Sequence, residues 1–462
     1  MPRACACNDF NRTELFRRAA ATAGSGLPAI EPGMPLPAGT GLNRRTFLTR
    51  SAGLAIAVYG GSKLSFGALD DGIAMAAANG GADSRVLVSV FLDGGIDSIS
   101  TLFPTGDPRY TALRPKLALP ASSGFAFTED ARLRWHASAE SLAKLHGEGK
   151  LSVFPAIGYT SPDKSHFTSR HYWEVGANDP LLRTGWLGRF LDRTGRANNP
   201  LQGLSLENRL QPALATATMP VASMDGADRY SFEAPGVTGQ VQTRMHETLA
   251  PLGAAHAKSN DPALRYAGEV ISQAAILRGQ VSPFQAGAIK SPVAYPTSND
   301  SFPRRLQGLA AMIATGLPLR CVAISAPGHY DTHANQPEAL SQGLKLTSDS
   351  LLAFQRDLET RGIADRVLVH VWSEFGRRAK ENGSDGTDHG AAGVGFVLGT
   401  RARGQMVGEF PGLANGLDKE GNLKATADFR GLYAAILEQW FETDAGAIIP
   451  NAASFSRPQI LK

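Results

Sequence analysis

Six carboxylate or imidazole side chains lie in short polar segments next to apolar runs: Asp93, Asp331, His333, Glu374, Asp388 and His389. Carboxylate oxygens and imidazole nitrogens bind divalent ions such as zinc, manganese, calcium or magnesium. Each segment also has a simpler interpretation, since Asp-Gly-Gly makes ordinary turns and Asp-x-His makes ordinary loop networks. Their joint placement at the ends of predicted strands favours a site for a divalent metal.

A second group of reactive side chains lies at the start of a predicted helix: Ser165, His166 and Arg170. The dipole at a helix start favours a bound anion and a forming alkoxide, so Ser165 could act as a nucleophile. His166 titrates near neutral pH and could act as an acid or a base, while Arg170 could bind an anionic oxygen. Simpler roles remain open, with Ser165 as an N-cap and His166 as an ordinary helix-face residue.

Short apolar runs rich in β-branched residues predict the strands that would position these segments. The strands are expected over residues 85–92, 151–157, 320–325, 366–372 and 393–398, with His370 as a core residue of the fourth. Helical spacing covers residues 165–176, 262–279, 302–316, 339–361 and 429–441, and residues 200–240 look like an irregular insertion. This alternation predicts an α/β fold, a doubly wound, largely parallel sheet flanked by helices, which binds ligands beyond the carboxyl ends of its strands.

Residues 1–82 are typical of an export region. The pair Arg44-Arg45 is followed by Thr-Phe-Leu, as in twin-arginine signals, and then by an apolar stretch over 51–66 that three glycines interrupt. That stretch is too short and too rich in glycine for a membrane span, although an arginine pair before a core helix is the alternative interpretation. We therefore expect a domain over residues 83–462 that the twin-arginine translocase exports to the periplasm, with no stable membrane span in the mature protein.

The expected domain is nearly neutral, because residues 1–82 hold eight of the 46 Lys and Arg but only five of the 42 Asp and Glu. A neutral domain lacks the basic surface that nucleic acids require, which excludes that class of partner. Cys321 is the only cysteine beyond residue 82. Neither an internal disulfide nor a cysteine-based zinc site can therefore form in this domain.

The order of the motifs resembles an uncharacterised exported, sulfatase-like family of the alkaline phosphatase superfamily, from about residue 43 to the C-terminus. The similar motifs are Asp-Gly-Gly at 93, Ser-His-Phe at 165, Asp-Thr-His-x-Asn-Gln at 331, Ser-Glu-Phe-Gly-Arg at 373 and Gly-Thr-Asp-His-Gly at 386. The resemblance implies an alkaline-phosphatase-like fold with a bimetallic site. It further implies Asp93 as a ligand of one metal, Ser165 as the nucleophile, and Asp331 with His333 as the second-metal loop, completed by Glu374 and His389.

Two departures from the superfamily pattern affect this assignment. The metal loop is Asp-x-His instead of Asp-x-x-x-His, and Phe375 follows Glu374 where a histidine is expected, so Asp388 or His166 would have to supply a ligand. The segment over residues 165–170 contains no cysteine, which argues against a formylglycine sulfatase mechanism.

Together these features predict a metal-dependent hydrolase of phosphate or sulfate esters that acts on a small anionic substrate outside the cytoplasm. The altered ligand spacing keeps a second hypothesis open. The protein could be a non-catalytic member of the same fold that binds a ligand, a glycan or a partner protein. A third hypothesis is an export-linked partner of another exported protein.

Overall fold

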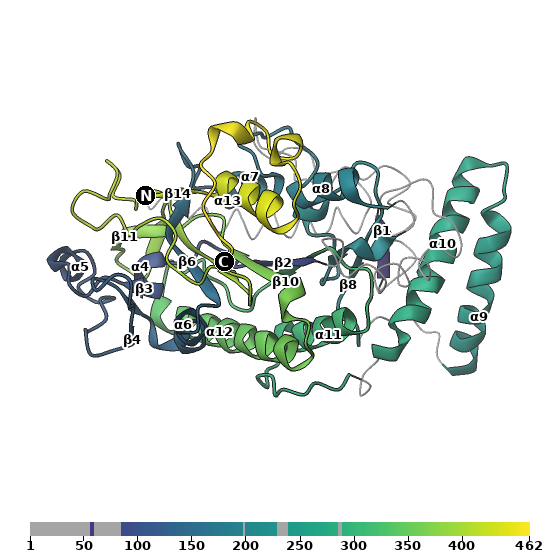
Figure 1. Cartoon of the computed structure of the whole chain (residues 1–462), viewed down its shortest axis with the longest axis horizontal. Helices are drawn as coiled ribbons and strands as arrows, with labels where there is room; N and C mark the ends of the chain where they lie inside the picture. Colours follow the sequence, from purple (N-terminus) through teal and green to yellow (C-terminus); the bar gives the residue numbers. More distant parts are fainter. Residues whose placement is uncertain (1–55, 60–84, 197–198, 229–238, 285–288) are drawn as a thin grey trace. The chain divides into compact units, whose positions relative to one another are not determined.

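The computed structural model describes residues 56–59, 85–196, 199–228, 239–284 and 289–462 (Figure 1). The chain divides into two compact units. The larger unit comprises Ser84–Ala177, Ser291–Ala310 and Ala323–Lys462, and the smaller one comprises Met1–Asp83, Asn178–Lys290 and Ala311–Val322. Every residue of the predicted site belongs to the larger unit.

The larger unit is built on a mixed sheet. Its strands lie in the order β9 (Cys321–Ser325), β2 (Val86–Phe91), β10 (Val367–Trp372), β13 (Gly393–Leu398), β6 (Leu151–Gly158) and β14 (Ala427–Asp428). Strands β2 and β10 pair in parallel, whereas β13 runs antiparallel to both β10 and β6. Every residue of β2, β6, β10 and β13 is buried, which explains their continuous apolar runs. The expected α/β class is therefore confirmed.

Helices cover both faces of this sheet. Helices α12 (Gln336–Thr360) and α6 (Glu140–Gly147) lie on one side of β2 and β10, and α7 (His166–Val175) and α13 (Phe429–Ala435) lie on the other (Figure 1). The Trp173 ring of α7 stacks on Trp372 of β10 and on Phe429 of α13, with centroids 5.6 and 4.5 Å apart. This aromatic stack holds α7 against the sheet and so fixes the place of its first residue, His166.

The other elements of the larger unit are short. They are α4 (Ser98–Thr101), β3 (Leu102–Phe103), α5 (Pro108–Leu113), β4 (Phe125–Ala126), β5 (Arg134–Trp135), β11 (Arg377–Glu381) and β12 (Thr387–His389). Helix α11 (Phe302–Ala314) crosses from the larger unit into the smaller one. The antiparallel pair β11–β12 brings Arg377 opposite His389.

The smaller unit contains strands β1 (Ile56–Tyr59), β7 (Gly203–Ser205) and β8 (Val221–Met224) and helices α8 (Trp186–Thr194), α9 (Gly239–His256) and α10 (Pro262–Val281). Strand β8 pairs antiparallel with β1 and parallel with β7. Strand β1 lies within the apolar stretch that the sequence assigns to the export signal. The arginine pair and the rest of that signal fall outside the described residues.

The ends of several strands meet at one edge of the large sheet. The Leu92 N–H donates to Trp372 O just past β2 and β10, and the Ala326 N–H just past β9 donates to Phe91 O, each over 2.8 Å. Gly393 at the start of β13 pairs with Ile157 near the end of β6. Segments far apart in the sequence therefore converge where the polar motifs begin. Among the described residues, no helix combines the length and apolarity needed to cross a membrane.

Candidate metal centre

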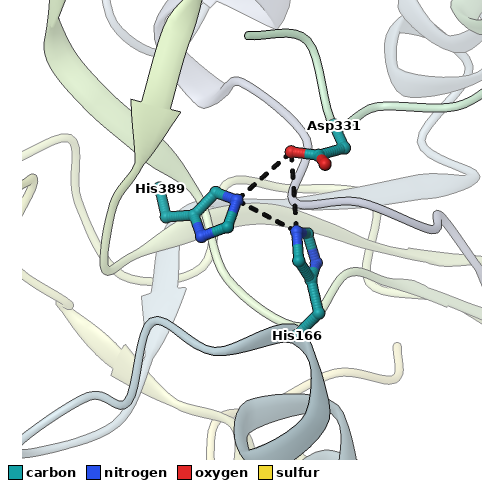
Figure 2. Close-up of side chains that lie close together, drawn as sticks. All are labelled: His166, Asp331 and His389. Atoms are coloured by element: carbon teal, nitrogen blue, oxygen red, sulfur yellow. Dashed lines mark hydrogen bonds and ion pairs between the residues drawn. The ribbon is translucent and has the colours of Figure 1, made fainter. Parts of the chain in front are cut away.

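Three side chains from distant parts of the chain point toward one another at this edge (Figure 2). His389 Nε2 lies 3.0 Å from His166 Nε2 and 3.2 Å from Asp331 Oδ1, and the His166 Nε2–Asp331 Oδ1 distance is 3.5 Å. His166 begins α7, Asp331 lies in the loop after β9, and His389 ends β12. Two imidazoles and a carboxylate thus present one atom each to a common centre.

His333 lies beside this group, close to two of its three members. Its Nε2 lies 3.0 Å from His389 Nε2 and 3.1 Å from Asp331 Oδ1. The loop after β9 therefore contributes both members of its Asp-x-His motif. The two-residue spacing, although shorter than the superfamily pattern, suffices to turn both side chains to one point.

The outer nitrogen of each histidine has its own acceptor. His166 Nδ1 donates to Glu374 Oε1 over 2.7 Å, and His389 Nδ1 donates to the Lys164 carbonyl over 2.8 Å. His333 Nδ1 lies 3.2 Å from Asp388 Oδ1. Since carboxylates and carbonyls only accept hydrogen bonds, each ring carries a proton on Nδ1 and turns Nε2 inward, where a metal ion can take the place of a second proton.

Nitrogen lone pairs that face a carboxylate oxygen repel it and one another unless protons or a cation lie among them. Zinc–nitrogen and zinc–oxygen bonds of about 2.0–2.1 Å in a tetrahedron place neighbouring ligand atoms roughly 3.3 Å apart. The separations of 3.0, 3.2 and 3.5 Å among His166, Asp331 and His389 surround that value. Histidines held by outer carboxylates and carbonyls are also the usual arrangement around protein-bound metals. The residues present therefore fit a divalent metal ion.

The electrostatics of the centre favour positive charge. Burial alone would raise the pKa of Asp331, but hydrogen bonds from the three histidines and the nearby Arg377 hold it far below its usual range. Burial lowers the pKa of His166, but the adjacent Asp331 and Glu374 outweigh it and raise that pKa to about 9. Burial leaves the pKa of His389 below its usual value. The carboxylates thus attract a cation to the inner edge of the rings.

Glu374 occupies a different place from the one the sequence predicted. Its buried carboxylate accepts from the backbone N–H groups of Gly94 and Gly95 and from Ser373 Oγ, over 2.9 to 3.3 Å, in addition to His166 Nδ1. Glu374 therefore orients His166 instead of facing the centre itself. Asp388 orients His333 in the same way, although the Asp388 side chain is 52% exposed.

The remaining predicted residues lie around the centre without joining the four inward atoms. Asp93 Oδ1 is buried and has no hydrogen-bond partner within the described part of the chain, and burial raises the pKa of this carboxyl. Arg170 donates to Glu174 Oε1 over 2.7 Å, lies 3.8 Å from Asp93 and sits over the Phe91 ring. These contacts already engage the guanidinium predicted to bind an anion. Ser165 is the N-cap of α7, but its side chain makes no capping hydrogen bond.

Sequence reasoning missed the groups that hold the two ligand-bearing loops together. Arg377 donates to Asp331 Oδ1 over 2.5 Å and to the carbonyls of Gly94, Gly95 and Thr387. Its place in the Ser-Glu-Phe-Gly-Arg motif was the available signal. Phe375 packs its ring 4.8 Å from both His166 and His389, where a ligand histidine was expected.

A glutamine links the same two loops from behind. Gln336 Oε1 accepts from Thr332 Oγ1 over 2.9 Å and from Thr387 Oγ1 over 2.5 Å. The Thr387 N–H also donates to Thr332 O over 3.0 Å. Thr332 lies between Asp331 and His333, and Thr387 lies two residues before His389. This network therefore sets the spacing of three of the four inward atoms.

The fold and the geometry of the site thus define an α/β protein with a candidate histidine–aspartate metal centre at the strand ends. The chain belongs to the family described as a protein of unknown function (DUF1501), whose model matches residues 84–450. The sequence resemblance to an uncharacterised family is confirmed, and all the motifs that carry it fall within the matched range. No curated protein matches the sequence.

Solved structures with similar folds include a lipoteichoic acid synthase from Listeria monocytogenes, at 9% identity and a TM-score of 0.33, covering 80% of this chain and 74% of that one. A protein in the alkaline phosphatase superfamily from Vibrio parahaemolyticus matches at 8% identity and a TM-score of 0.34, covering 96% and 78%. A sulfatase from Pseudoalteromonas sp. matches at 12% identity and a TM-score of 0.35, covering 86% and 78%. Because these similarities are distant, the proposals below depend on the geometry of the site.

Proposed function

We propose that this protein is an exported, metal-dependent hydrolase of phosphate or sulfate esters. The observation that carries the proposal is the convergence of His166, His333 and His389 on Asp331, with every Nδ1 held by an outer acceptor. Such a donor set suits zinc and also manganese, while carboxylate oxygens keep calcium and magnesium open. A bound divalent ion would supply Lewis-acid stabilisation of the negative charge on the ester oxygens.

The protein's own residues would prepare the site for that chemistry. His166, Asp331 and His389 hold the ion, with His333 beside them, while Glu374, Asp388 and the Lys164 carbonyl keep the rings in orientation. Ser165 immediately precedes His166 at the start of α7, where the helix dipole favours an anionic oxygen, so we propose it as the nucleophile. A small anionic ester bound at this end of the sheet would be the substrate.

One observation favours a second candidate function. His333 Nε2 lies 3.0 Å from His389 Nε2 and 3.1 Å from Asp331 Oδ1, and if it also bound the ion the protein would supply four ligands. Closed sites of this kind are structural, whereas catalytic sites keep a position open. The protein would then be a non-catalytic member of its fold that binds a ligand, glycan or partner protein.

Metal analysis and ester turnover on one preparation test these proposals. The wild-type protein, purified without chelator, should contain a stoichiometric divalent metal and hydrolyse p-nitrophenyl phosphate or sulfate. His389→Ala should lose both, by more than the roughly 10–100-fold cost of removing an outer partner. His256→Ala, at the end of α9, is the matched control. Metal without turnover of any ester would support the second function, and absence of metal after reconstitution would overturn both.

Export through the twin-arginine pathway is proposed from Arg44 and Arg45, which lie outside the described residues. The full chain with Arg44→Lys and Arg45→Lys should accumulate in the cytoplasmic fraction instead of the periplasm. The leader holds a second pair, and Arg17→Lys with Arg18→Lys should leave export unchanged. Equal export of the two double variants would contradict the proposal.

A further inference from the structure

A pocket of about 320 Å³ lies within the larger unit, and its lining contains none of the candidate metal ligands. One wall is the loop over residues 159–162, between β6 and α7, and the other is the segment over residues 423–428 that leads into α13. Ala391, two residues after His389, lies between them in the lining. The volume is at the lower end of the range for small-molecule sites.

Two sets of contacts connect this pocket to the centre. Lys164, two residues after the lining residue Pro162, accepts from His389 Nδ1 with its carbonyl and pairs its ammonium with Glu420, two residues after the lining residue Asp418. At the other end, the Tyr159 hydroxyl donates to Ser169 Oγ over 2.9 Å, and Ser169 Oγ donates to Glu374 O over 2.5 Å. Asp163 and Lys164 therefore separate the lining from His389 on the first path, and Ser169 separates it from Glu374, the partner of His166, on the second.

The charges around the pocket nearly balance. Asp428 is paired with Arg430, whose Nε and Nη2 atoms lie 2.9 and 2.6 Å from its two carboxylate oxygens. Asp418 already accepts from the Asn422 side chain and from two backbone N–H groups. Lys424 donates to the Asn415 carbonyl over 2.9 Å. The lining therefore presents two carboxylates and a single lysine to a second phosphate or sulfate group.

The polar lining offers both hydrogen-bond donors and acceptors. Thr160 and Lys424 supply a hydroxyl and an ammonium donor. The Thr426 hydroxyl donates to the Glu409 carbonyl and can accept, as can the carboxylates of Asp418 and Asp428. Neutral hydroxyl groups can meet both kinds of partner, since each hydroxyl donates once and accepts twice. An uncharged polyol is therefore more complementary to this lining than an apolar or polyanionic group.

We propose that this pocket binds the alcohol part of the ester, and that this part is an uncharged polyhydroxylated group of about the size of one hexose. The inference deepens the proposed function and rests on it, since the metal centre would hold the anionic part of the same molecule. The pocket thus selects substrates by their leaving group. Esters of nucleotides or of other polyanions are disfavoured.

The test compares two esters with the same anionic group, a hexose 6-phosphate or 6-sulfate and the matching p-nitrophenyl ester. Wild-type protein should prefer the hexose ester in kcat/KM. Lys424→Met, which removes a donor from the lining, should reduce the ratio of hexose to p-nitrophenyl kcat/KM by roughly tenfold. Lys419→Met, an exposed lysine outside the lining, should leave the ratio unchanged.

A second variant fills the space instead of removing a donor. Thr160→Trp should reduce the same ratio while the metal content stays at its wild-type value. If hydrolysis of the p-nitrophenyl ester persists and both variants keep the wild-type ratio, the pocket inference is overturned and the proposed function stands.

Binding of methyl α-D-glucopyranoside, methyl galactoside and methyl mannoside, followed by saturation-transfer NMR, separates failure of the two proposals. Binding that Thr160→Trp abolishes would support the pocket even if the protein hydrolyses neither ester. Absence of binding by all three uncharged probes, together with no preference for the hexose ester, would overturn the inference.

Discussion

Each imidazole at the candidate metal centre depends on one acceptor behind it. The acceptor that holds His166 belongs to Glu374, which is fully buried and carries four hydrogen-bond donors around its carboxylate. The acceptor that holds His333 belongs to Asp388, which is half exposed. Since solvent can replace an exposed partner and cannot replace a buried one, the two carboxylates should contribute unequally to metal affinity.

Glu374→Gln should weaken metal binding by roughly 10–100-fold, because the amide cannot accept from all the donors that surround the carboxylate. Asp388→Asn keeps an acceptor oxygen and access to water, so its effect should be smaller. Competition with a chelator, read as a dissociation constant for zinc, checks both variants. Equal affinities for the two would argue against an orienting role for Glu374.

His370 shows the opposite behaviour, because neither of its ring nitrogens has a hydrogen-bond partner among the described residues. It is 1% exposed in β10, and the Tyr433 ring packs edge-on with the ring centroids 5.4 Å apart. Burial lowers its pKa to about 3. The prediction of a core histidine is confirmed by its burial, and this ring stays neutral at physiological pH.

The depressed pKa of His370 makes stability depend on pH. The unfolded chain takes up a proton near pH 6.5 and the native state does not, so the contribution is complete above that pH and lost as pH falls toward 3. The wild type should lose about 2 kcal/mol from this residue between pH 7 and pH 5. His370→Leu should remove that part of the loss in urea unfolding, and His256→Leu should not. Parallel pH profiles for the wild type and His370→Leu would refute the assignment.

At the scale of elements, the centre requires close backbone contact between the loop before β12 and the loop that carries His333. A Cβ on Gly386, just before β12, would lie 2.3 Å from the His333 carbonyl carbon and 2.4 Å from Thr332 O. Gly386 does not have a positive φ angle, so its requirement is space alone. A Cβ on Gly383, three residues earlier in the same loop, would meet no other atom within 4 Å.

Gly386→Ala should therefore separate the loop of His333 from the strand of His389 and lower metal content. Gly383→Ala, a chemically identical change, should leave the metal content at the wild-type level. Elemental analysis of both variants, with circular dichroism to confirm folding, makes the comparison. Full metal occupancy in Gly386→Ala would show that the approach of these two elements is not needed.

At the scale of the whole molecule, the chain beyond residue 82 relies on packing and hydrogen bonds without any disulfide. Cys321 is a free thiol, fully buried in β9, and burial raises its pKa to about 12. An inaccessible thiol with a raised pKa reacts slowly, because the thiolate is the nucleophile.

Iodoacetamide should therefore label Cys321 only after the protein unfolds, as mapped by mass spectrometry of its peptide. Reducing agent should leave the melting temperature unchanged, since no disulfide involves this residue. Rapid labelling of Cys321 in the native protein would contradict the packing of β9.

The sequence predicted the larger unit better than the smaller one. Buried strands appear as unbroken apolar runs, so β2, β6, β9, β10 and β13 were each located within about two residues. Helix α9 was missed, since its residues extend the region that looked like an insertion and include Pro251. The antiparallel direction of β13 left no local signal, because both faces of this strand are buried as in a parallel one.

The sequence by itself determined the α/β class, the family and the motifs that carry the site, because strand runs and motif order are local properties of the chain. Tertiary structure alone decided which motif residues face inward. It placed His333 beside His389 despite the short Asp-x-His spacing, and it put Glu374 behind His166. Ligand roles depend on distances between residues more than 150 positions apart, such as His166 and His389. Those distances arise from the packing of α7, β9 and β12, which no local pattern specifies.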